Sequence, residues 1–413
     1  MTSRVTKGAY AGLLAISLAV TLASCATDAP APPPPPPPTP IPVAPPVALA
    51  PEISDAAAVY VDYVNRARAI SANFTDGDNV QSQLRDGETF EPKQLARGVV
   101  AYGAIVAMQD PDFRNAFRGF AANSAQRADM VSRLISDPTY AGSIATSDTA
   151  ARRVIQALSA DGAGIYKSGS DVKQAAYDIQ HQKWSTQFIA DRDSRLALAK
   201  QNSVTLASVQ SDHSAKLLTA ALTGQGMSVP SGSRALSGQA TATPATSEAP
   251  VAPVALGDAI SSYTQADLYQ KPYTQTVNEA LTIAALAIMG EGGADKTDTL
   301  TQMLNQNEGA SCLNMSKLNL YQCLAVAKPY YEDVFCLGQH VLMDTGQCLG
   351  KMSSNALSFA PVIKVGFKAD GTSAYSDPKP YITPPAPLKK KKGGATKSKG
   401  KASTTKSSTA KKK

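Results

Sequence analysis

Four cysteines in the C-terminal third constrain the fold of this chain more than any other feature. Cys323 and Cys336 lie nearly equidistant from Pro329, and so do Cys312 and Cys348. A proline can stop one helix and open the next, and residues equidistant from the turn of an antiparallel helical hairpin face each other. The spacing therefore predicts nested disulfides, Cys323 with Cys336 and Cys312 with Cys348, in a hairpin whose second helix ends at Thr345-Gly346.

The first 25 residues have the organisation of an export signal. Arg4 and Lys7 precede an apolar stretch over residues 13–22, which is too short to span a bilayer. Leu22-Ala23-Ser24-Cys25 follows and resembles the lipobox of bacterial lipoproteins. The resemblance implies that residues 1–24 are removed and that Cys25 is lipidated. With Ala26 next rather than Asp, it implies an outer-membrane lipoprotein of the cell envelope whose body is periplasmic.

The remaining four cysteines are open to other arrangements. On one helix, Cys312 and Cys323 would lie about 16 Å apart, too far to bond, so pairing them requires Cys312 and Cys348 to fold back from loops. A metal site is the other alternative, because Cys336 and His340 are one helical turn apart with Cys323 across the hairpin. An oxidising compartment favours disulfides. The hairpin resembles in form the twin-cysteine hairpins of small mitochondrial intermembrane-space proteins, with wider and uneven spacing here.

Composition divides the chain into segments. Residues 25–51 form a lipidated, proline-rich tether, in which seven consecutive prolines at 32–38 favour polyproline II. Apolar residues recur at helical spacing over 52–222, and a flexible Gly/Pro/Ser-rich linker follows over 223–253. A second helical region over 254–365 contains the cysteine hairpin and an apolar run at 280–289 that fits a buried helix. Residues 366–413 form a proline-containing, then lysine-rich, disordered tail. The sequence therefore predicts a mainly α fold: a helical bundle with a disulfide-linked helical hairpin, flanked by disordered Pro-rich and Lys-rich segments.

Residues 171–222 contain neither proline nor glycine, which predicts one long helix or two helices joined by a kink. Tyr177, His181, Trp184 and Phe188 are spaced to form an aromatic stripe on one face of that helix. Such a stripe can stack on a sugar or a peptide, but packing surface is the favoured interpretation.

The net charge of +7 is located in the tail. Removing eleven tail lysines and the two basic signal residues from that total leaves the body at −6. The tail resembles histone-like low-complexity tails and favours salt-dependent binding of an anionic envelope polymer, with a merely solubilising role as the alternative. Specific nucleic-acid binding is not expected. The tail lysines are Lys389, Lys390, Lys391, Lys392, Lys397, Lys399, Lys401, Lys406, Lys411, Lys412 and Lys413.

Catalytic signals are weak. The chain has three histidines, His181, His213 and His340, without zincin spacing. Ser170-x-x-Lys173 matches a β-lactamase motif by letter only, because Lys296-Thr297 is followed by Asp298 rather than Gly. The sequence predicts no enzyme, cofactor or metal. It favours a scaffold that tethers the outer membrane to peptidoglycan or lipopolysaccharide; the alternative is an accessory protein-binding module of an export or surface-assembly complex.

Overall fold

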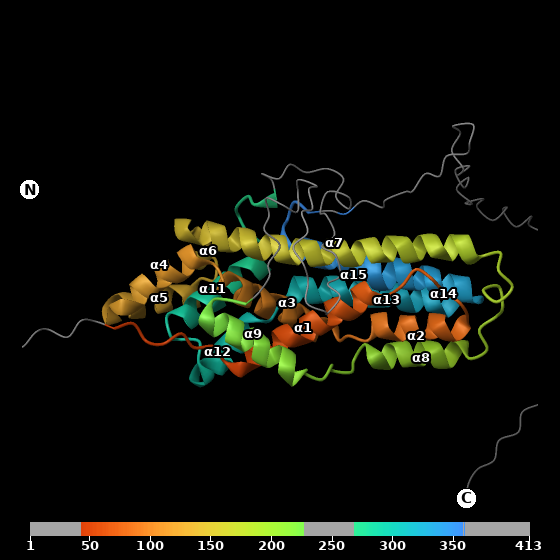
Figure 1. Cartoon of the computed structure of the whole chain (residues 1–413), viewed down its shortest axis with the longest axis horizontal. Coiled ribbons are helices and arrows are strands. Elements are labelled where there is room, and N and C mark those ends of the chain that lie inside the picture. The colour runs from red at the N-terminus through yellow and green to blue at the C-terminus, as the bar shows by residue number, and fades with distance from the viewer. Residues whose placement is uncertain (1–42, 227–267, 358, 360–413) are drawn as a thin grey trace, which may run out of the picture. The chain divides into compact units, whose positions relative to one another are not determined.

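A computed structural model describes residues 43–226, 268–357 and 359 of the chain (Figure 1). This described part is a helical bundle without strands, as the sequence predicts. The principal helices are α1 (Pro51–Ala69), α2 (Gly77–Glu88), α3 (Pro92–Ala107), α4 (Pro111–Ala122), α5 (Ser124–Ser136), α6 (Tyr140–Ser143), α7 (Asp148–Ile179), α8 (Arg192–Asn202), α9 (Ser211–Thr223), α11 (Gln275–Ile288), α12 (Thr297–Met303), α13 (Asn307–Val326), α14 (Tyr330–Cys336) and α15 (Asp344–Ser353), with a π-helical segment η4 (Leu337–Met343) between the last two.

The core is built around α3 and α11, which pack against each other and are buried along most of their length. Helix α3 begins at Pro92, where the Glu91 side chain accepts hydrogen bonds from two backbone amides. Helix α11 begins after Thr274, whose hydroxyl accepts from the amide of Val277 at 3.2 Å. The apolar run at 280–289 lies in or next to α11 and is fully buried, as expected.

The two helical regions that the sequence separates at 223–253 share this core. Helix α3 comes from the first region and α11 from the second, and α7 of the first packs on α15 of the second. Residues 44–357 therefore belong to one compact unit wherever the chain is described. No helix of this described part is long and apolar enough to cross a membrane. Residues 254–267 and 360–365 of the predicted second region lie outside the described residues.

Glycines set the close approach between α7 and the segments η4 and α15. A Cβ atom on Gly169 would lie 2.7 Å from the carbonyl oxygen of Gly338, and one on Gly346 would lie 2.7 Å from that of Gly162. The predicted helix end at Thr345-Gly346 is therefore wrong: the second arm of the hairpin runs through α14, η4 and α15 to Ser353. Gly346 is a contact residue rather than a helix stop, because a larger side chain would separate the two backbones.

The prediction of one long helix, or of two joined by a kink, over residues 171–222 is also wrong. Helix α7 ends at Ile179, and two shorter helices, α8 and α9, follow. The Ser185 hydroxyl donates a hydrogen bond to the carbonyl of Ile179. The amide of Ile189 donates to the carbonyl of Lys328 at 2.9 Å in the hairpin turn. Tertiary hydrogen bonds thus replace the helical ones in a segment that has no proline or glycine.

Candidate functional site

The end of the tether is fixed to the bundle. Arg118 on α4 donates hydrogen bonds to the carbonyls of Pro45 and Ala44, and to that of Ile288 at 3.1 Å. The amide of Ala48 donates to the carbonyl of Ala287 at 3.0 Å. Leu49 and Ala50 are buried, so residues 44–50 form a clamped segment rather than a free spacer.

Glycine makes room for this clamped segment. Gly290 has a φ of +84°, and a Cβ there would lie 2.6 Å from the Cβ of Pro45. Only glycine adopts that backbone region readily. The loop after α11 is therefore shaped to receive the proline-rich chain.

The cysteines form two disulfides across the hairpin. Cys312 bonds to Cys348 and Cys323 to Cys336, with Cα–Cα distances of 5.7 Å in both, which are ordinary for a disulfide. This is the nested pairing that the symmetry about Pro329 predicts. It also uses both thiols of the alternative metal site, Cys323 and Cys336, and no group of three or more metal-ligating side chains occurs among the described residues.

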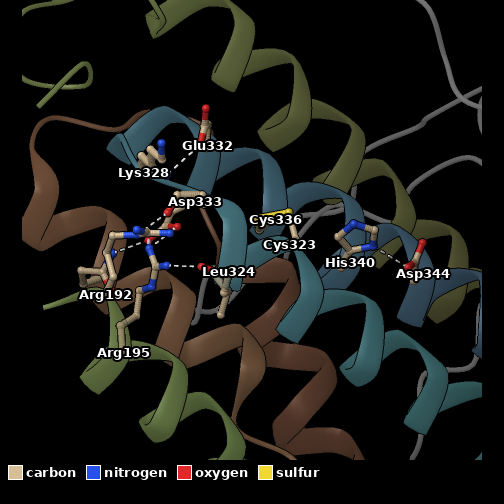
Figure 2. Close-up of a disulfide and its surroundings, with 12 residues drawn as sticks. Arg192, Arg195, Cys323, Leu324, Lys328, Glu332, Asp333, Cys336, His340 and Asp344 are labelled. Atoms are coloured by element: carbon tan, nitrogen blue, oxygen red, sulfur yellow. Dashed lines mark hydrogen bonds and ion pairs between the residues drawn. A yellow bond between two sulfur atoms is a disulfide. The ribbon is translucent and has the colours of Figure 1, made fainter. Parts of the chain in front are cut away.

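The hairpin turn is held by arginines from α8 (Figure 2). Arg192 donates to the carbonyls of Ala325 and Ala327, each at 2.8 Å, and so caps the C-terminus of α13. Arg195 forms a buried ion pair with Asp333 on α14, which also accepts from the Gln81 amide at 2.8 Å. Burial raises the pKa of Asp333, although Arg195 opposes this shift. These contacts fix the turn from outside the hairpin.

A second buried charge joins α13 to α2. Lys317 is 2% exposed, donates to the backbone carbonyl of Glu88 and lies 3.5 Å from the centroid of the Phe90 ring. Burial lowers the pKa of Lys317 and raises that of Glu88. Lys317 is not among the residues predicted from the sequence, although its spacing from Leu313 and Leu320 places it on the apolar face of α13. Its amine binds at the C-terminus of α2, where a cation is favoured.

An open groove lies beside the hairpin turn and has a volume of about 270 Å³. Three aromatic rings line it, those of Tyr177 on α7 and of Tyr331 and Phe335 on α14. The Tyr177 and Phe335 rings are 6.2 Å apart. Val326, which is 72% exposed, and Glu332 also line the groove.

The predicted aromatic stripe does not form. Tyr177 lies on α7, but His181, Trp184 and Phe188 lie in the turn that follows it. Phe188 is 74% exposed and contributes backbone pairing to Pro329 instead of packing. The stripe required α7 to continue as far as Phe188, but the helix ends at Ile179. Of the four residues, only Tyr177 lines the groove.

The other two histidines each face one carboxylate. His213 Nδ1 lies 2.6 Å from Asp62, and His340 Nδ1 lies 2.9 Å from Asp344. Ser170 and Lys173 of the β-lactamase-like motif both lie within α7, where Lys173 bonds to Gln339 at 2.7 Å. Cys25 and the eleven tail lysines lie outside the described residues.

Taken together, the fold and these contacts define an all-helical domain with two nested disulfides and a clamped N-terminal segment. Comparison with protein-family models, with curated proteins and with solved structures finds no match.

Proposed function

We propose that this protein is an envelope lipoprotein with a structural role. It tethers the outer membrane, through lipid on Cys25, to an anionic envelope polymer, peptidoglycan or lipopolysaccharide, through its lysine-rich tail. The observation that carries the proposal is the clamp on residues 44–50. Arg118 bonds to both Pro45 and Ile288, and the amide of Ala48 bonds to the carbonyl of Ala287, so a pull on the tether would act on the end of the buried helix α11. The two disulfides support placement in an oxidising compartment.

The polymer-binding half is tested by co-sedimentation of the mature protein with purified peptidoglycan sacculi and with lipopolysaccharide aggregates. We expect sedimentation at low salt that weakens as salt rises, because the contacts are between exposed charges. Deleting residues 389–413 should abolish it. A control tail of equal length, with all eleven lysines replaced by glutamine, separates charge from length. Equal sedimentation of all three proteins would overturn the proposal.

The anchoring half is tested by mass spectrometry of the N-terminal peptide from membrane-derived protein. The expected peptide begins at Cys25 and carries acyl chains, and more than one chain is needed for stable anchoring. A Cys25→Ser variant should be released from membranes by washing. An unmodified peptide that begins elsewhere would contradict lipidation.

A second candidate is an accessory protein-binding module, favoured by the exposed face of α13. Met315 and Leu318 are 56% and 43% exposed, and the one charged side chain in the central part of that helix, Lys317, is buried. In-cell crosslinking followed by mass spectrometry would identify a partner. A complex that survives high salt and is lost in Leu318→Glu would favour this function over polymer tethering.

A further inference from the structure

The groove beside the hairpin turn has the chemistry of a proline-binding site. Tyr177, Tyr331 and Phe335 present aromatic rings on an open, largely apolar surface. Aromatic grooves of this kind bind polyproline II segments, which are extended before binding and therefore lose little entropy. Glu332, which also lines the groove, supplies a single carboxylate, one oxygen of which accepts from the amide of Lys328 at 2.7 Å. Figure 2 shows this residue pointing away from the buried pair of Arg195 and Asp333.

The chain contains a segment that matches this surface. Residues 384–389 read Pro-Pro-Ala-Pro-Leu-Lys, with prolines three residues apart and a lysine two residues after the second. We propose that the groove binds residues 384–388 of the same chain as a polyproline II segment, with Lys389 paired to Glu332. The remaining tail lysines would then extend from the end of the bundle opposite the clamped segment, residues 44–50. This binding does not require the proposed polymer function.

The length of the chain allows this contact. Phe359, the last described residue, packs on Tyr166 of α7 with ring centroids 5.2 Å apart. Tyr166 and Tyr177 are eleven residues apart on the same helix, which is about 16 Å. The 24 residues between Phe359 and Pro384 can span up to about 80 Å. The segment therefore reaches the groove with slack.

The N-terminal proline run does not fit this site. For its first four prolines, residues 32–35, to fill the groove, Pro35 must lie in it. Pro35 is nine residues from Ala44 and can be about 32 Å from it at most. Ala44 is held by α4, and the start of α4 bonds to Thr149 near the start of α7. From Thr149 to Tyr177 along α7 is about 42 Å, and Figure 1 shows α4 and α14 at opposite ends of the bundle. The C-terminal segment is the occupant that both chemistry and reach favour.

Zero-length carbodiimide crosslinking of the mature full-length chain tests this proposal, because it joins a carboxylate to an amine only when the two are in contact. We expect a Glu332–Lys389 crosslink to dominate among all crosslinks of the tail lysines. Replacing Pro384→Ala together with Pro387→Ala should lower its yield by about five-fold. The matched control, Pro378→Ala with Pro380→Ala, should leave it unchanged.

Val326→Arg tests the groove side. This residue is 72% exposed, so the substitution does not disturb the core, and it should lower the yield by both bulk and repulsion of Lys389. Circular dichroism confirms that each variant is folded. Tail crosslinks spread evenly over exposed carboxylates, or an unchanged yield in the Pro384/Pro387 variant, would overturn the proposal. So would mixed-isotope crosslinks from a mixture of heavy and light chains, because they would place the segment on a second copy.

Discussion

Arg195 and Asp333 form an ion pair in which the two side chains are only 6% and 0% exposed. Removing one partner of a buried pair leaves a charge without compensation, which costs roughly 3–5 kcal/mol. We expect Arg195→Met to destabilise the protein by that amount in urea unfolding. Arg195→Met combined with Asp333→Leu should recover most of the loss. Arg133→Ala, which breaks an exposed pair with Asp129, is the matched control and should have no measurable effect.

The two disulfides should differ in their contribution to stability. The outer bridge closes a loop of 36 residues and the inner one a loop of 13. The loop-entropy model gives about 4 kcal/mol for the outer and about 3 kcal/mol for the inner. We expect Cys312→Ser with Cys348→Ser to lower the free energy of unfolding more than Cys323→Ser with Cys336→Ser does. The opposite order would show that native-state packing, rather than loop closure, decides the effect.

Two glycines on helices should respond oppositely to alanine. A Cβ on Gly169 would meet backbone atoms of Gly338 and Met343 at 2.7 Å, so Gly169→Ala should destabilise the bundle by about 1–3 kcal/mol. Apart from the backbone of its own helix and its chain neighbours, no heavy atom lies within 4 Å of the Cβ position of Gly119 on α4. Gly119→Ala should therefore stabilise by about 0.5–1 kcal/mol through helix propensity. Thermal unfolding of both variants measures this contrast, and a loss of stability in both would refute the assignment of Gly169 to a close backbone contact.

Glu279 should make stability depend on pH. Burial raises the pKa of Glu279 from 4.5 to about 7, although hydrogen bonds from Gln275 and Gln306 oppose the shift. The folded state thus holds the proton more tightly than the unfolded state. The contribution of Glu279 to the free energy of unfolding is greatest below about pH 4.5. It falls as pH rises to about 7 and is constant above that, with a total change of up to about 3 kcal/mol.

The variant Glu279→Gln isolates this effect, because the amide has nearly the size of the carboxyl group and does not titrate. It keeps an acceptor oxygen for one of the two donors, Gln275 and Gln306. Between pH 4.5 and pH 7.5, the unfolding free energy of the wild type should fall relative to that of the variant. A difference that is constant across this range would mean that Glu279 does not retain its proton on folding.

The sequence was sufficient for those features that depend on spacing along the chain. The disulfide pairing follows from the distances of Cys312, Cys323, Cys336 and Cys348 from Pro329, and α11 follows from the apolar run at 280–289. The helix start at Pro92 also follows from local rules, because the proline occupies the first turn after Glu91, whose side chain caps the helix.

Features that depend on contacts distant in sequence were not predictable in this way. The end of α7 at Ile179 is set by hydrogen bonds from Ser185 and to Lys328 in the hairpin turn, and no helix-breaking residue in the local sequence indicates it. From the local sequence alone Gly346 indicates the end of a helix, and only its contact with α7 explains why a glycine is there. The groove likewise combines residues from α7, α13 and α14, so no single stretch of sequence encodes it.

The outer disulfide has a consequence for the chain's survival under proteolysis. Cys312 and Cys348 enclose the whole hairpin turn. A protease that cuts a peptide bond anywhere between them yields two fragments that are still covalently joined. The N-terminal segment that carries Cys25 and the C-terminal segment that carries the lysines would therefore stay connected after a nick at this turn. Because the inner bridge also spans the turn, they would separate only when both bridges are reduced.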